Sequence, residues 1–182
     1  MSELEILQNG FVAFLDGLWW GLRDNTGPLS MYEGYERGFR QFGSEQAERD
    51  GGNGAEAAAG IASKIMNAIG MKTEVNGSEV SVKECPVWNR ILEKGLEFAF
   101  HVEEICWTPL LEGIGEKTGV KPVMLSSLRL NHIAKAKIDY KKNKAKGALE
   151  KGAIVQEDFD RQDTKLSLEA TQIPKVGKYR FE

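Results

Sequence analysis

The side chains with the clearest capacity for chemistry in this 182-residue chain are two cysteines and two histidines. Cys85, Cys106 and His132 stand on separate predicted elements that a compact fold can bring together. Two thiolates and an imidazole can hold zinc, and a zinc ion with three protein ligands keeps a coordination position for water or substrate. These three residues are therefore a candidate zinc site, with His101 as an alternative ligand.

The spacing of these residues leaves a second interpretation open. Twenty residues separate Cys85 from Cys106, and 25 separate Cys106 from His132. Closed zinc sites contain a short Cys-x-x-Cys or His-x-x-x-His step, which this set lacks. In the alternative interpretation both cysteines are small buried apolar side chains, and His132 is a polar residue of a turn.

Cys85 is also a candidate nucleophile. It precedes Pro86 at the predicted start of a helix, where the backbone dipole lowers the pKa of a thiol. Cys106 stands between Ile105 and Trp107 and is expected to be buried. A hydrolase that attacks a small amide or heterocycle, through metal-bound water or through Cys85, is therefore an alternative function.

Helical periodicity dominates the first 70 residues. The segment 11–22, FVAFLDGLWWGL, is apolar on nearly all sides, and a third helix is expected over 55–70. Between them Tyr32, Tyr35, Phe39 and Phe42 recur at three- and four-residue steps and form an aromatic stripe on one helix face. Such a stripe packs into a core or lines a cavity, and the sequence is compatible with both.

After residue 70 the hydrophobic periodicity changes from about 3.6 residues to two. Strands are expected on both sides of Asn76-Gly77, a strong signal for a two-residue hairpin turn. Helical patterns follow from Pro86 to Gly119, and a second strand pair is expected over 121–130 and 133–142. The predicted class is α+β, with helices packed on one side of a twisted antiparallel sheet made of two hairpins.

We expect one domain over residues 1–147 and a C-terminal appendage over 148–182, which adds an edge strand, acts as a dimer arm or is partly mobile. Residues 135–151 hold seven lysines against two acidic residues. Those lysines protect a sheet edge from pairing with other chains, or attract an anionic ligand.

Composition narrows the class of protein further. A net charge of −3 excludes a dedicated basic nucleic-acid-binding domain. The longest apolar stretch, 11–22, carries Asp16 and is too short to cross a bilayer. The N-terminal MSELEILQ lacks the basic start of a secretory signal, so a cytoplasmic location is expected.

Three segments resemble a known family. KECPVW, EEICWTPLLEGIGEKTG and VMLSSLRLNHIAKAKIDY are similar to the 4-vinyl reductase or hydrocarbon-binding domain family and to the neighbouring L-2-amino-thiazoline-4-carboxylic acid hydrolase-like proteins. The family closes on a strand pair with a Gly-Asp turn and a last cysteine. Here Asn131-His132 stands near that turn and the last cysteine is absent, so a metal site carried over from the family would need His132 or His101 in its place.

The resemblance implies a fold shared with haem-nitric-oxide-binding and TRAPP-type domains, often dimeric, with a pocket for an apolar or heterocyclic small molecule. The expected pocket lining is Trp19, Tyr32, Tyr35, Phe39 and Trp107. Neither haem nor a nucleotide is indicated. The expected function is therefore small-molecule binding by a homodimer with a candidate zinc site, and a protein-interaction subunit is a further alternative.

Overall fold

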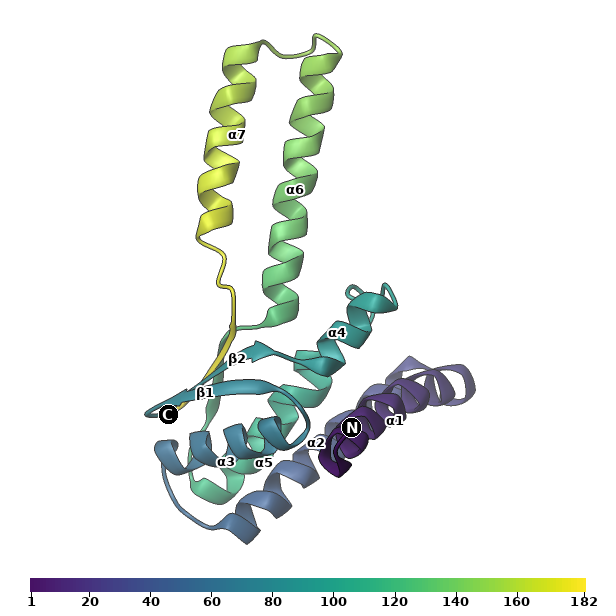
Figure 1. Ribbon diagram of the computed structural model, residues 1–182, viewed down its shortest axis with the longest axis vertical. Coiled ribbons are helices and arrows are strands. Elements are labelled where there is room, and N and C mark those ends of the chain that lie inside the picture. Colours follow the sequence, from purple (N-terminus) through teal and green to yellow (C-terminus); the bar gives the residue numbers. More distant parts are fainter.

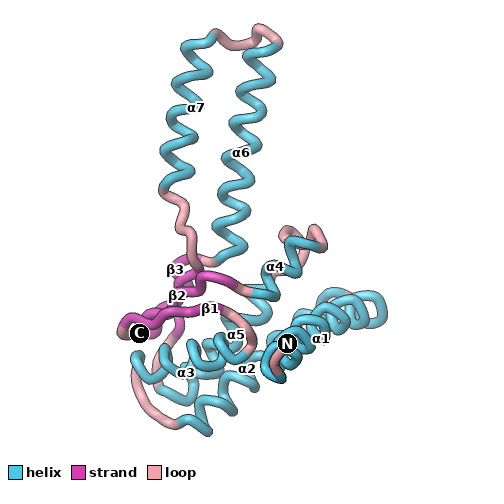
Figure 2. Tube along the Cα trace, in the orientation of Figure 1, coloured by secondary structure: helices cyan, strands magenta, loops and turns pink.

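The computed structural model, which describes residues 1–182, is mostly helical and contains four strands (Figure 1; Figure 2). None of the helices is long and apolar enough to cross a membrane. The elements are α1 (Glu3–Thr26), α2 (Pro28–Asp50), α3 (Ala55–Ala68), β1 (Lys72–Asn76), β2 (Glu79–Glu84), α4 (Pro86–Glu93), the π-helix η1 (Glu103–Trp107), α5 (Thr108–Thr118), β3 (Pro122–Ser126), α6 (Leu128–Glu150), α7 (Gln156–Thr171) and β4 (Gly177–Phe181).

The strands form one antiparallel sheet in the order β1-β2-β4-β3. The β1–β2 hairpin forms as predicted, but its two-residue loop is Gly77-Ser78 and not Asn76-Gly77, because Asn76 pairs with Glu79. Gly77 takes a positive φ of 57° at the first position of this loop. Helices α3 and α5 pack against the sheet, and Tyr179 and Phe181 of β4 are buried in the core. The predicted α+β class, the first hairpin and the helical cover of the sheet are confirmed.

The predicted second hairpin is wrong. Only residues 122–126 form a strand, and 128–150 form the helix α6. Ser127 begins that helix, because its hydroxyl accepts a hydrogen bond from the backbone N–H of Leu130 at 3.0 Å. The alternation of alanine and lysine after His132 fits a strand with one solvent-exposed face. Both residue types are also strong helix formers, and the segment is long enough to form a helix.

Helices α6 and α7 pack together as an arm that projects away from the sheet (Figure 1). The lysines of residues 135–151 lie on this arm and not on a sheet edge. The expected boundary at residue 147 falls inside α6, and β4 lies between β2 and β3. The end of the chain therefore supplies an inner strand, which corrects the edge strand expected within residues 148–182.

Two glycines let α2 and α5 cross with their backbones in contact. A Cβ atom added to Gly43 would lie 2.0 Å from the carbonyl oxygen of Leu110, and one added to Gly113 would lie 2.0 Å from that of Arg40. Both distances are far shorter than real carbon–oxygen contacts, and the neighbours are backbone atoms that cannot rotate away. This crossing requires glycine at both positions.

We expect Gly113→Ala to lower the free energy of unfolding by at least about 2 kcal/mol, because the helices must separate to admit the methyl group. Gly38→Ala is the matched control: Gly38 lies within α2 with no atom near an added Cβ, so this change is expected to raise stability by about 1 kcal/mol. Urea denaturation measures both. Equal effects of the two substitutions would contradict the close crossing.

Candidate functional site

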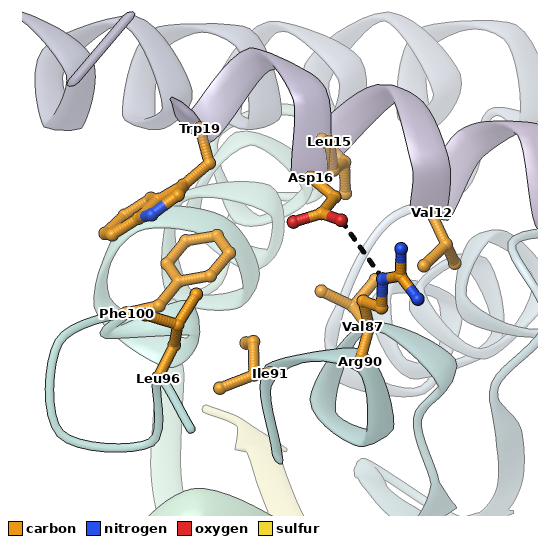
Figure 3. A pocket seen from close by; sticks show the side chains of 9 residues that line it. All are labelled: Val12, Leu15, Asp16, Trp19, Val87, Arg90, Ile91, Leu96 and Phe100. Carbon is orange, nitrogen blue, oxygen red and sulfur yellow. Dashed lines mark hydrogen bonds and ion pairs between the residues drawn. The ribbon is translucent and has the colours of Figure 1, made fainter. Parts of the chain in front are cut away.

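A small apolar cavity lies between α1, α4 and the irregular segment that follows α4 (Figure 3). Its volume is about 10 Å³, which is room for a single water molecule. Side chains from α1 meet side chains from α4 and from the segment 94–102 across it. The lining residues are Val12, Leu15, Asp16, Trp19, Val87, Arg90, Ile91, Leu96 and Phe100.

Trp19 supplies the unusual polar feature of this cavity. Its indole is 3% exposed and packs on the ring of Phe100 with 4.1 Å between ring centroids. Its Nε1–H is buried and has no hydrogen-bond partner. An unpaired buried donor costs about 1–3 kcal/mol, so an acceptor that reached this N–H would remove that cost.

An ion pair forms one wall. Asp16 of α1 accepts a hydrogen bond from Nε of Arg90 of α4 at 3.0 Å (Figure 3). The Asp16 side chain is mostly buried, whereas that of Arg90 is 41% exposed. The pair therefore links the two helices at the edge where the cavity approaches solvent.

The remaining wall comes from a segment without regular structure. Residues 94–101 contain turns, and Gly95 takes a positive φ of 66°. Leu96 and Phe100 of this segment close the cavity, and Glu97 places a second unpartnered buried polar atom, its Oε2, on the same segment. This side of the cavity is therefore closed by loop side chains and not by a regular helix.

The aromatic stripe mainly fills the core. The Tyr35 hydroxyl donates a hydrogen bond to the carbonyl of Leu15, and burial raises the pKa of Tyr35 well above its usual value. Phe39 packs edge-on against Trp107 at 5.5 Å between centroids, and the hydroxyl of Tyr32 donates to the carbonyl of Ala99 at 3.1 Å. Of the five predicted pocket residues, only Trp19 lines the cavity beneath α1.

A buried charged centre lies on the other side of η1. Arg129 of α6 donates from Nε to Glu103 at 2.7 Å and from a guanidinium nitrogen to Glu104 at 2.7 Å. The Arg129 backbone N–H also donates to Glu103 at 3.2 Å. The side chains of Glu103 and Arg129 are only 2% and 5% exposed, so each compensates the other's buried charge.

Cys85 and Cys106 are both buried near this centre. The Cys85 sulfur accepts a hydrogen bond from the backbone N–H of Trp88 at 3.3 Å at the start of α4. Burial nevertheless raises the pKa of Cys85 to about 12, and burial together with the nearby Cys85 and Glu103 raises the pKa of Cys106 well above its usual value. The predicted lowered pKa of Cys85 is wrong, because desolvation outweighs the helix N-terminus.

The predicted zinc ligands are not assembled. The structure contains no group of three or more His, Cys, Asp and Glu side chains placed to hold a metal ion. The ring of His132 packs edge-on against Trp88 at 5.6 Å between centroids, and that of His101 lies over Tyr32 at 6.4 Å. The two cysteines do lie near one another, and zinc binding by Cys85, Cys106 and His132 stays a prediction.

Sequence reasoning missed most of the cavity and the whole Glu103–Arg129 pair. A signal for the pair was present, since Arg129 is flanked by Leu128 and Leu130 and an arginine within an apolar run needs a buried partner. Leu96 and Phe100 carried no such signal, because irregular segments have no periodicity that assigns a side chain to a face.

Both thiols are expected to resist alkylation by iodoacetamide at about pH 8 in the folded protein, because only the thiolate attacks. They should react fully in concentrated urea.

The free energy of unfolding should fall as the pH rises above 9.0, since the unfolded thiols ionise near that pH while the pKa of folded Cys85 is about 12. Cys85→Ala should reduce this loss. Rapid alkylation of the native protein would contradict the assigned burial.

Comparison with known proteins finds no matching family model, no similar curated protein and no similar solved structure. The resemblance to the hydrocarbon-binding domain family therefore stays a prediction.

Proposed function

We propose that this protein binds a small apolar molecule carrying one hydrogen-bond acceptor in the cavity between α1, α4 and residues 94–101. The unpartnered Nε1–H of Trp19 in the wall of this cavity is the observation that supports the proposal. An acceptor atom on the ligand would satisfy that donor, and the ligand would therefore be selected by polarity as well as by shape.

The other residues that line the cavity suit the apolar part of such a ligand. Seven of the nine lining residues are hydrophobic, and the two charged ones satisfy each other in the Asp16–Arg90 pair. Trp19 and Phe100 present aromatic surfaces, which favour a planar ring through stacked or edge-on contacts. A charged ligand would find no free counter-charge among these residues.

Binding requires the cavity to expand. A volume of about 10 Å³ accommodates water only, so Leu96 and Phe100 must move outward to admit a ring. Gly95 at the start of their segment provides a flexible joint. The opening must also break the hydrogen bond from the Leu96 N–H to the carbonyl of Ile91 at 3.0 Å or that from the Tyr32 hydroxyl to the carbonyl of Ala99 at 3.1 Å. The free-energy cost of this opening would lower the net affinity for the ligand.

The hydrolase alternative has weaker support. A nucleophilic cysteine needs a thiolate near neutral pH, whereas burial raises the pKa of Cys85 to about 12 and raises that of Cys106 as well. Neither histidine is hydrogen-bonded to a cysteine: His101 lies near the carbonyl of Phe98, and His132 packs on Trp88. Binding without turnover is therefore the better account.

Acetophenone and α-methylstyrene test the proposal, because they have nearly the same shape and only the ketone has an acceptor. Isothermal titration calorimetry of the native protein should show about fivefold tighter binding of acetophenone than of α-methylstyrene. This ratio corresponds to a net contribution of about 1 kcal/mol from one hydrogen bond. Trp19→Phe should bind both compounds equally, since it keeps an aromatic ring and removes the donor.

Trp20→Phe is the matched control, since Trp20 is the next residue of α1 but is 38% exposed and does not line the cavity. It should keep the preference for acetophenone. The proposal is contradicted if neither compound binds the native protein, or if Trp19→Phe and Trp20→Phe retain the preference equally.

A further inference from the structure

A groove lies between α6 and α7 in the outer part of the projecting arm. Its volume is about 440 Å³, within the roughly 300–1,000 Å³ of small-molecule sites. The arm extends away from the sheet and from α1 (Figure 1), so this groove is separate from the cavity that contains Trp19. It is therefore a second candidate site, and the larger of the two.

The groove forms because few side chains fill the space between the two helices. Beyond the base of the arm, the buried residues of these helices are Ile138, Ala145 and Leu166. The one ion pair between α6 and α7 joins Lys142 to Asp163 at 3.3 Å, and neither residue lines the groove. The helices are therefore held together beside the groove, and its interior stays free.

The interior of the groove is apolar. Ala145 and Leu166 are buried there, and Ala148 and Ile154 are half-buried beside them. All four side chains are aliphatic and have no hydrogen-bonding group. A ring or chain that covers them removes apolar surface from water, which favours binding.

Three lysines from the two helices line the same groove. Lys141 and Lys144 lie three residues apart and so share one side of α6, and Lys165 comes from α7. All three side chains are exposed, and none forms an ion pair within the chain. The one carboxylate that lines the groove is that of Glu169, so the groove has an excess of positive charge.

The rest of the arm does not neutralise this excess. Helix α6 holds seven lysine and arginine residues against two acidic residues. Helix α7 holds five acidic residues, but four of them do not line the groove. Like charges at three- and four-residue spacing destabilise a helix, so an anion bound among the lysines removes an unfavourable interaction.

We propose that the groove between α6 and α7 binds a small phosphate monoester with an apolar body. The phosphate lies among the ammonium groups of Lys141, Lys144 and Lys165, and the body covers the apolar interior. Lysine binds phosphate as a compact positive charge, and a dianion matches three lysines and one glutamate better than a single carboxylate does. The proposal does not depend on the ligand proposed for the cavity beneath α1.

A nucleic acid fits this groove less well than a small molecule. Proteins that bind single strands combine a long basic track with aromatic or arginine side chains on which bases stack. The groove is lined by neither residue type, and from Lys141 to Ala148 it follows only about 10 Å of helix. That length accommodates one monoester and is too short for a polymer track.

Three compounds separate the two parts of the proposed ligand: 1-naphthyl phosphate has both, 1-naphthol has only the ring, and inorganic phosphate has only the anion. Isothermal titration calorimetry of the full chain at about pH 7.5, where the monoester is a dianion, should give a dissociation constant below about 1 mM for 1-naphthyl phosphate. Binding of the other two should be at least about tenfold weaker. Absence of 1-naphthyl phosphate binding, or equally tight binding of inorganic phosphate, would overturn the proposal.

Lys144→Gln and Lys165→Gln should each weaken 1-naphthyl phosphate binding at least about fivefold, because each removes a positive charge from the groove. Lys146→Gln is the matched control: Lys146 is an exposed lysine of α6 that forms no ion pair and does not line the groove. It should bind as the native protein does. Equal losses in all three variants would indicate a diffuse charge effect and overturn the site.

Two further measurements identify where and from what source the anion binds. Trp19→Phe should leave 1-naphthyl phosphate binding unchanged, and a loss in this variant would place the compound in the cavity beneath α1 and overturn the proposal. Cosedimentation with phosphatidylcholine vesicles that contain phosphatidic acid tests a lipid headgroup as the source. Binding to these vesicles without binding of free 1-naphthyl phosphate would overturn the small-molecule site in favour of a membrane surface.

Discussion

The backbone contact between α2 and α5 at Gly43 and Gly113 is the constraint on which the rest of the structure depends. Because the two helices touch there, the π-helix η1 that leads into α5 is held against α2, and Trp107 meets Phe39. The buried Glu103 lies in the same π-helix and receives Arg129 from the base of the projecting arm. One close crossing therefore positions both the aromatic core and the buried ion pair.

The two sides of helix α1 differ in chemistry. The inner side carries Leu15 and Trp19 into the core and leaves one indole N–H without a partner. On the outer side Leu7 and Phe14 are 70% and 64% exposed.

The sequence predicted the helical first third, the first hairpin and the burial of Cys106, because periodicity and turn chemistry are local properties. It failed for residues 128–150, where alternating alanine and lysine fit both periods and helix propensity decides the outcome. It failed also for β4, whose inner position is set by long-range pairing with β2 and β3. The stripe of Tyr32, Tyr35 and Phe39 was identified correctly as a helix face, but its role in filling the core depends on Trp107 and Phe100, which lie far along the chain.

The central claim is that an acceptor-bearing apolar ligand binds against Trp19 after residues 94–101 open. A crystal structure of the protein grown with acetophenone tests it most directly. The account predicts the ring between α1 and α4, the ketone oxygen within hydrogen-bond distance of Nε1 of Trp19, and Leu96 and Phe100 displaced outward. A ligand bound elsewhere, or a ring in this cavity with its oxygen turned away from Trp19, would contradict it.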